Sequence, residues 1–459
     1  MTASASVTLV IQTFAMLSVL LIVGMILRAK LSVFQNLYLP ACVIGGFLGL
    51  ILGPNVLNIL PIPSDMMGVA SALPGVLFTP IIAALPICSA PLDGAAIKKE
   101  KPVLVLTAIL CLMGSLQYGM GLLVNSGFAA IGVETYRTFG LELAQGFIGG
   151  HGQAGATGSM LAALNQPYWE TAQGIVSTTA TVGMIGGLII GILMINVAAR
   201  RGYTKIIKEA SSVPAEMLAG FFNPKQERPS MGTQTTVTNN IETLSLHLGI
   251  LLIATGAGYI IANLLKRLNW SLLGALATWI YALAAMYVIW FVIRKCKIDY
   301  LFDEKVKNTV TGLLSDYLIT AAIMSIPVQV VINYWLPLLT MCVLGLIVTP
   351  TVIYFLGKKF VGDSWFEKSL GPLGCCTGVF VTGMLLIKMA DPDFQTSALN
   401  DYSLAYTIHN FYIIPLVVFL FPFVVSSGAT SGGLVCLALS CGFFILTVLL
   451  GRNNMKTQL

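Results

Sequence analysis

One glycine-rich pattern occurs twice in this chain, near the end of each half. The copies are Gly146-Phe-Ile-Gly-Gly-His-Gly-Gln-Ala-Gly-Ala-Thr-Gly158 and Gly371-Pro-Leu-Gly-Cys-Cys-Thr-Gly-Val-Phe-Val-Thr-Gly383. At an offset of 225 residues, from Gly146 to Gly371, they share three glycines and one threonine. Irregular backbone is tolerated within a membrane only where protein buries it or it borders a watery cavity. The repeat therefore indicates a solute path between packed helices.

The composition places the chain in a membrane. It is 56% hydrophobic and 10% charged, whereas soluble domains carry about 25% charged residues. We therefore expect an all-α, multi-pass protein whose partner is the lipid bilayer. The nine cysteines show no metal-ligand spacing, and the chain contains no Walker loop or HExxH motif.

Apolar runs near the roughly 20-residue length of a membrane span predict eleven spanning helices. These are Val7–Arg28, Pro40–Asn58, Met67–Cys88, Val103–Val124, Thr171–Ala199, Thr243–Leu265, Ser271–Arg294, Val310–Tyr334, Leu336–Gly357, Ser403–Ser426 and Thr430–Gly451. The second of these runs is short and carries four glycines, so it is either broken or tightly packed. The two glycine-rich segments fall between spans, and each is predicted to be a re-entrant hairpin.

Charge sets the predicted orientation. With the N-terminus outside and the C-terminus in the cytoplasm, every Lys and Arg except Arg137, Lys266 and Arg267 lies on the cytoplasmic side. Basic residues favour cytoplasmic loops, which supports this topology in a plasma (cell inner) membrane. The net charge of +6 then follows from topology, so no nucleic-acid partner is expected.

The topology predicts two halves in opposite orientation, each with five spans and one hairpin. Residues 1–199 form the first repeat, with its hairpin at about 141–165, and 243–426 form the second, with its hairpin at about 367–390. Residues 200–242 are a cytoplasmic linker, and 427–459 add a further span and a short tail. Entering from opposite sides, the two hairpin tips should meet and enclose the solute.

The hairpins supply the candidate substrate-binding residues. They are Gly149, Gly150, His151, Gly152, Gln153, Gly155, Thr157, Gly374, Cys375, Cys376, Thr377, Gly378 and Thr382. At Gly150 and Gly152 we expect backbone conformations that only glycine adopts readily. Close packing of small residues is the alternative explanation for the glycines, and a local structural hydrogen bond is the alternative for His151. A dinucleotide-binding loop is disfavoured, because the GxGxxG match lacks a βαβ unit.

Two polar residues inside spans are candidates for coupling a cation. Asp316 is the clearest intramembrane carboxylate, and such residues are functional candidates because burying them is costly. Asn410 is a weaker candidate, next to His409. A solvated role at a helix end is the alternative for Asp316. Asp391 and Asp393 flank a proline and are expected to form a turn or cap, and His247 is expected to be structural.

The sequences Gly149-Gly-His-Gly152 and Pro40-Ala-Cys-Val-Ile-Gly-Gly46, with a second hairpin at a matching place, resemble the bacterial sodium/glutamate symporter family. The resemblance implies Na⁺-coupled uptake of an anionic amino acid, inverted repeats, a homodimer and an elevator mechanism. It implies no enzyme activity and no cofactor besides Na⁺ as the coupling ion. Gly374-Cys-Cys-Thr-Gly378 departs from the family pattern, which leaves open another organic anion or H⁺ coupling. A membrane-embedded enzyme and a passive channel are further alternatives.

Overall fold

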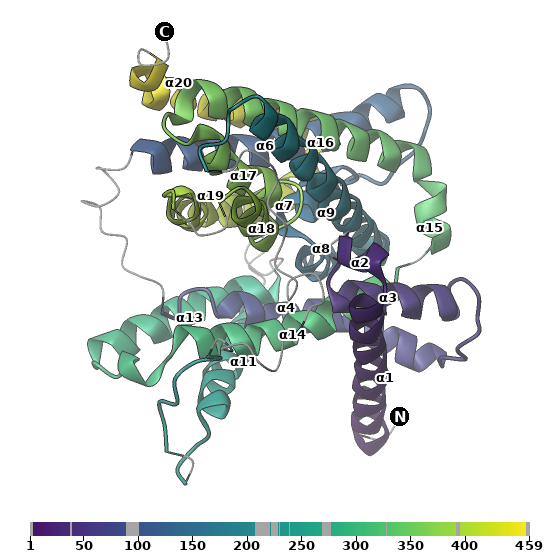
Figure 1. The fold of residues 1–459 in the computed structure, drawn as a ribbon. Helices are drawn as coiled ribbons and strands as arrows, with labels where there is room; N and C mark the ends of the chain where they lie inside the picture. The colour runs from purple at the N-terminus through teal and green to yellow at the C-terminus, as the bar shows by residue number, and fades with distance from the viewer. Residues whose placement is uncertain are drawn as a thin grey trace. The chain divides into compact units, whose positions relative to one another are not determined.

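The computed structural model describes residues 3–36, 39–88, 101–206, 221, 228, 230–237, 239–268, 277–326, 328–391 and 395–455. Within these ranges the regular secondary structure is helical (Figure 1). The chain forms two compact units. Unit 1 comprises 1–91, 152–174 and 215–328, and unit 2 comprises 92–151, 175–214 and 329–459. Each unit therefore draws on both halves of the sequence.

Unit 1 is built mainly from six helices that pack side by side. They are α1 (Ala3–Lys30), α3 (Ala41–Leu52), α4 (Ser64–Ala83), α11 (Thr243–Arg267), α13 (Thr278–Lys295) and α14 (Glu304–Met324). The short helices α2 (Ser32–Asn36) and η1 (Asp299–Leu301) connect them, and α8 (Gly152–Ala163) packs on α4. Helix α9 (Trp169–Arg200) begins in this unit and continues into unit 2.

Glycines bring the helices of unit 1 close together at α3. Gly45 faces the backbone of Leu20 on α1, and Gly46 and Gly49 face Ile323 and Met324 on α14. A side chain at any of these three positions would collide with its neighbour. The glycines of this predicted second span therefore serve tight packing, one of the two expected explanations.

Unit 2 is organised around α6 (Lys101–Ala130), which packs against α7, α16, α19 and α20. The other helices are α7 (Leu141–Gly149), α15 (Val328–Asn333), α16 (Trp335–Leu356), η2 (Gly357–Val361), α17 (Trp365–Cys375), α18 (Phe380–Ala390), α19 (Ala398–Ser427) and α20 (Ala429–Met455). Helices α17 and α18 pack on each other and on α19, as Figure 1 shows in green and yellow-green.

The described residues contain nine helices long and apolar enough to cross a membrane. The observed helices differ from the expected eleven spans at two places. Helix α3 has 12 residues, too few for the roughly 20 that cross the hydrocarbon. The predicted span Val310–Tyr334 is divided between α14, which ends at Met324, and α15. Pro327 follows closely in the sequence and disfavours helix at the residue before it.

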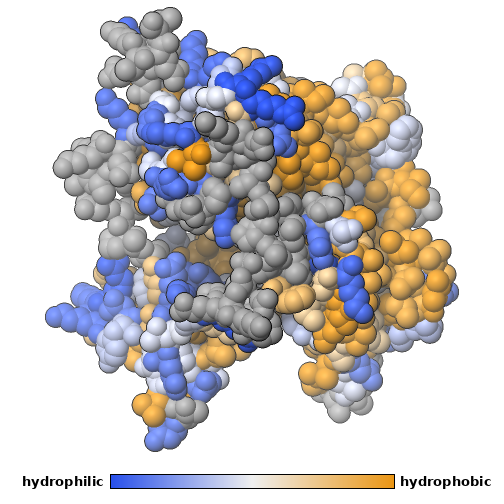
Figure 2. All heavy atoms as spheres, viewed as in Figure 1, coloured by the Kyte–Doolittle hydropathy of each residue, from blue (hydrophilic) through white to orange (hydrophobic). Residues whose placement is uncertain are grey.

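The helices expose apolar side chains of the kind that face lipid. Val7 on α1, Val288 on α13 and Phe419 on α19 are 64%, 64% and 67% exposed. Figure 2 shows broad apolar areas on the visible surface. Since soluble monomers rarely expose large contiguous apolar patches, this is a multi-pass membrane protein. Most of the predicted linker 200–242 and the start of the predicted span Ser271–Arg294 lie outside the described residues.

Candidate functional site

The two hairpin tips meet in unit 2. Gly150 follows Gly149, the last residue of α7, and has a φ of +67°, a conformation that L side chains rarely adopt. A β-carbon at Gly150 would lie 2.5 Å from Cγ1 of Val379 and 3.2 Å from the carbonyl oxygen of Gly378. The first tip thus leaves no room for a side chain against the second tip.

His151, beside this contact, is held by α9. Its Nε2 lies 2.9 Å from Oγ1 of Thr181, and that hydroxyl donates to the carbonyl oxygen of Ser177. Because the threonine has a single hydroxyl proton, His151 must donate from Nε2. The alternative expected for His151 is a neutral histidine donating to a local carbonyl, and the observed partner is instead a hydroxyl on α9, 30 residues away. A role for its other nitrogen in binding substrate stays a prediction.

The second tip, residues Cys376–Val379, interrupts the helix between α17 and α18. The nitrogens of Gly378 and Val379 both donate to the carbonyl oxygen of Gly374, and Val379 is fully extended. The side chain of Thr377 donates to the carbonyl oxygen of Leu373 and is completely buried. The turn therefore closes on itself through its backbone and leaves the carbonyl oxygen of Cys376 available to other elements.

Close packing accounts for the glycines that the two copies share. Gly146 fits against Thr179 and Ala180 of α9, and Gly374 fits against the backbone of Gly383 between the two arms of the second hairpin. Gly183 and Gly187 of α9 face Thr377. These contacts match the packing explanation for the repeated glycines, so a solute role rests on the tips rather than on the glycine count.

Gln117 of α6 holds the second tip. Its Nε2 donates to the carbonyl oxygen of Cys376 at 2.7 Å and to Oγ1 of Thr349 at 2.8 Å. A carbonyl oxygen can only accept, so these bonds fix the orientation of the amide. Oε1 of Gln117 is then buried, with no hydrogen-bond partner among the described residues. An oriented, orphaned amide oxygen beside a carbonyl is suited to a cation or an ammonium group.

The remaining residues of the first hairpin lie on α8 in unit 1. Gly155 packs directly on Pro74 of α4, and Gln153 is half-buried. Thr157 is completely buried, and its Oγ1 has no partner among the described residues. The expectation of a glycine-only conformation at Gly152 is wrong. Gly152 lies in the first turn of α8 without a left-handed φ, and a β-carbon there would meet nothing within 4 Å.

On the second hairpin, the remaining candidates are enclosed by unit 2. Cys375 and Cys376 are completely buried and Thr382 is 5% exposed. The side chain of Thr382 lies against Gly378, so it faces the tip from the first turn of α18. A role for these residues in lining the solute path stays a prediction.

The two cation-coupling candidates belong to different units. Asp316 on α14 is exposed, and its carboxylate lies close to the thiol of Cys42 on α3. Asn410 on α19 is half-buried and lies one turn after Tyr406 on the same helix. Coupling roles for both stay predictions.

The expectation for His247 is confirmed, since it bonds the carbonyl oxygen of Thr243 at 2.8 Å and accepts from the backbone of Asp303. The side chain of Asp391 accepts from the backbone nitrogens of Gln395 and Thr396 and so caps the segment that follows it, as expected. Asp393 lies outside the described residues.

The sequence analysis missed three residues. Gln117 is a lone amide inside a predicted apolar span, which was an available signal. Glu142 and Glu367 are related by the same offset of 225 that aligns the glycines. Each lies in the first turn of its hairpin helix and is 0% exposed. The pairing was visible by extending the alignment four residues toward the N-terminus.

Unit 1 has a separate cavity of about 360 Å³. Its walls come from α4, α8, α11 and the starts of α9 and α13. Its polar side chains include Ser71, Thr79, Ser159, Gln173 and Thr278. Gln173 donates to the carbonyl oxygen of Ser71 across this wall. The tips of the hairpins do not contribute to its lining.

Apolar helices long enough to cross a membrane accompany the buried turn of the second tip. The family model of the sodium/glutamate symporter matches residues 7–365, and the chain belongs to that family. The match includes the first hairpin and ends before the second tip and α19. No curated protein matches the chain.

Among solved structures, the chain is similar to the sodium proton antiporter MjNhaP1 from Methanocaldococcus jannaschii. The identity is 17%, the TM-score is 0.36, and the match covers 94% of this chain and 99% of that one. A similarity of this size carries no conclusion about fold or mechanism.

Proposed function

We propose that this protein is a Na⁺-coupled symporter that imports glutamate or a similar small anionic amino acid. Membership of the sodium/glutamate symporter family supports the class of substrate and ion. The observation that carries the proposal is the orphaned Oε1 of Gln117 beside the carbonyl oxygen of Cys376 at the second tip. Carriers use such unwound carbonyls to coordinate Na⁺ and helix N-termini to hold substrate carboxylates.

The tips supply both kinds of group. The carbonyl side of the second tip faces Gln117, and α18 begins immediately after it at Phe380. The N-terminus of a helix carries partial positive charge that attracts an anion. We place Na⁺ near Gln117 and the substrate carboxylate near the start of α18, with Gly150 and Gly378 as close backbone neighbours.

The proposal includes the topology and the movement expected from the sequence. The protein lies in the cell inner membrane with its N-terminus outside, its halves are inverted repeats, and two copies form a homodimer. Transport proceeds by an elevator movement that exposes the tips to each side in turn. The division of the described helices into two units supports this part of the proposal.

Uptake into proteoliposomes tests the function. With an inward Na⁺ gradient we expect accumulation of labelled glutamate, and replacing Na⁺ by choline at fixed pH and potential should abolish it. Equal uptake in choline and in Na⁺ would contradict the proposed Na⁺ coupling. A second candidate, carriage of another organic anion, is favoured by the departure of the second tip from the family pattern, and competition by a panel of amino and dicarboxylic acids distinguishes the two.

The ion-binding role of Gln117 has a control on the same helix. Gln117→Leu removes the amide oxygen, and we expect the Na⁺ concentration for half-maximal uptake to rise about tenfold, as for loss of one hydrogen-bonding group to a charge. Asn125 on α6 has a satisfied amide that binds the carbonyl oxygens of Tyr136 and Phe139. Asn125→Ala should lower stability without changing the Na⁺ dependence, and equal shifts in both variants would assign Gln117 a structural role.

A further inference from the structure

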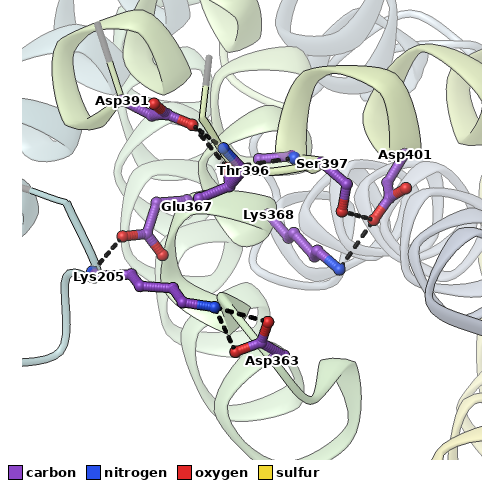
Figure 3. Close-up of polar contacts among 9 residues, drawn as sticks. Lys205, Asp363, Glu367, Lys368, Asp391, Thr396, Ser397 and Asp401 are labelled. Atoms are coloured by element: carbon purple, nitrogen blue, oxygen red, sulfur yellow. Dashed lines mark hydrogen bonds and ion pairs between the residues drawn. The ribbon is translucent and has the colours of Figure 1, made fainter. Parts of the chain in front are cut away.

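Glu367, at the base of the second hairpin, has one satisfied and one unsatisfied carboxylate oxygen. Its Oε1 accepts from the backbone nitrogen of Lys205 at 2.5 Å, and Figure 3 shows the side chain turned toward that nitrogen. Its Oε2 is buried with no hydrogen-bond partner among the described residues. Glu367 is 0% exposed, so Oε2 does not reach the surface of the described structure.

Two lysines around the base of the second hairpin are bound to other carboxylates. The Nζ of Lys205 lies 2.8 Å from Asp363, and the Nζ of Lys368 lies 2.8 Å from Asp401 (Figure 3). Asp391, completely buried, adds negative charge that acts on Glu367. Asp391 accepts three hydrogen bonds from Gln395 and Thr396. Glu367 therefore lies in the field of a second carboxylate, and Lys205, the cation that acts on it among the described residues, has its ammonium paired with Asp363.

Within the described residues, the other elements packed against α17 do not supply a cation to Glu367. Helix η2 contributes Lys358, whose ammonium lies 4.9 Å from the ring centre of Tyr203, and Lys359, which lies over Phe360. Helix α6 contributes Lys101 at its exposed first residue, and α18 contributes Lys388. None of these is hydrogen-bonded or ion-paired to Glu367 in the described structure.

The corresponding glutamate of the first hairpin shows what a satisfied carboxylate looks like in this position. Oε1 of Glu142 accepts from the hydroxyl of Tyr136 at 2.8 Å, and Oε2 accepts from the backbone nitrogen of Gly140 at 2.7 Å. Each oxygen therefore has a donor. The second hairpin lacks one of the two donors, and an unpaired buried carboxylate oxygen is costly.

We propose that Glu367 is a proton-binding site, and that its proton resides on Oε2. In the protonated acid, Oε1 remains the carbonyl oxygen and keeps its bond from Lys205, while Oε2 carries the hydrogen and loses its charge. The proton comes from water, and no other bond forms or breaks. The site lies at the base of the hairpin and is distinct from the tip residues proposed to bind Na⁺ and substrate.

Infrared difference spectroscopy of the purified full-length protein tests this inference directly, without measuring transport. At neutral pH we expect the carbonyl band of a protonated carboxylic acid in the native protein, with a shift in deuterated water. Glu367→Gln should remove this band, whereas Asp363→Asn, at an exposed carboxylate of the same hairpin base, should retain it. Absence of the band from the native protein, or its persistence in Glu367→Gln, overturns the proposal.

A second pair of variants keeps the test sharp if Glu367→Gln folds poorly. Lys205→Pro removes the backbone N–H that bonds Oε1 and should shift the acid band to higher frequency, because the carbonyl group loses its hydrogen bond. Lys205→Ala removes the ion pair to Asp363 but keeps the N–H, so the band should stay in place. Identical bands in both variants contradict the assignment to Glu367. Failure of Na⁺-coupled uptake leaves this result unaffected.

Discussion

In the first hairpin, the glutamate near the base is bonded by residues of its own loop, Tyr136 and Gly140. In the second, the equivalent Glu367 depends on Lys205, a residue 162 positions away in the sequence. The neighbouring Lys368 and Asp401 tie the same base to α19. Glu142 and Glu367 occupy matching positions in the two glycine-rich segments. Glu142 is bonded by residues near it in the sequence, and Glu367 by a residue far from it.

The two hairpins also differ in how they divide between the compact units. The chain passes from unit 2 to unit 1 at His151 and Gly152, between α7 and α8. Both arms of the second hairpin belong to unit 2 and pack through Gly374 and Gly383. The boundary between the units therefore falls inside the first hairpin and outside the second.

The largest effect should come from breaking the buried ion pair of the second hairpin. Lys368 and Asp401 are 7% and 8% exposed and 2.8 Å apart, and Ser397 also donates to Asp401. Lys368→Met leaves the Asp401 carboxylate buried without its cation. The free energy of unfolding should therefore fall by about 3–5 kcal/mol. The thermal stability of the purified protein in detergent measures this.

The double variant Lys368→Met with Asp401→Leu is the control for that prediction. Removing both charges leaves no unpaired ion, and apolar replacement of a buried pair is often close to neutral. We expect the double variant to be more stable than Lys368→Met alone. If both variants lose the same stability, Lys368 and Asp401 stabilise the protein through packing and not through their charges. The long-range bond at the base of the second hairpin would then not depend on an ion pair.

The next largest effect should occur at the first tip. Gly150→Val forces a branched side chain into a left-handed backbone, at a cost of about 1–2 kcal/mol, and into contact with Val379. Uptake should fall at least tenfold. The structure predicts the opposite for Gly152, where a β-carbon has open space, so Gly152→Ala should transport nearly normally. Loss of uptake in Gly152→Ala would indicate that the first tip adopts another conformation during transport.

The helix pairs α7–α8 and α17–α18 could be located from sequence because glycine interrupts otherwise continuous apolar runs, and their re-entrant course stays a prediction. The predicted ranges 141–165 and 367–390 lie close to the observed α7–α8 and α17–α18. The spans α3 and α14 were harder to predict, since hydropathy does not record where a helix ends inside a membrane. The role of Gly155 was also hidden, because it depends on Pro74, a residue distant in sequence.

The site itself could be predicted only in part. The tip residues carry a visible pattern, and their contact through Gly150 and Val379 agrees with the expectation that the tips meet. Gln117 could not be connected to Cys376, because the pairing joins α6 to a turn 259 residues later. Burial and orphaned atoms are properties of the packed structure, so the sequence alone gives no measure of them.

A smaller effect is expected on α8, where substitution of Gly155 tests whether this glycine serves packing or substrate binding. Gly155 lies against the backbone of Pro74, and a β-carbon there would collide with it. Gly155→Ala should therefore cost about 1–3 kcal/mol, the usual penalty for overpacking, and should lower the melting temperature. Gly152→Ala on the same helix is the matched control and should leave the melting temperature unchanged. A normal melting temperature for Gly155→Ala, combined with lost uptake, would favour a substrate role for Gly155.

The smallest effect should come from the exposed pair at the base of the second hairpin, in contrast to its buried neighbour. The hydrogen bond from Lys205 lowers the pKa of Asp363, and the bond to Asp363 raises the pKa of Lys205. The stabilisation from Asp363 is thus lost as pH falls through its lowered pKa, and that from Lys205 is lost as pH rises through its raised pKa. Between the lowered pKa of Asp363 and the raised pKa of Lys205, the stabilisation by this ion pair does not change with pH.

Because the side chains of Lys205 and Asp363 are 53% and 80% exposed, water and salt screen their attraction. Asp363→Asn should therefore leave the melting temperature at neutral pH within experimental error, and any difference at low salt should vanish at high salt. Asp401→Asn, measured in parallel, should lower the melting temperature at both salt concentrations, because its partner Lys368 is buried. A large, salt-independent loss in Asp363→Asn would mean that the exposed pair also fixes the hairpin base, and that burial does not distinguish the two bonds.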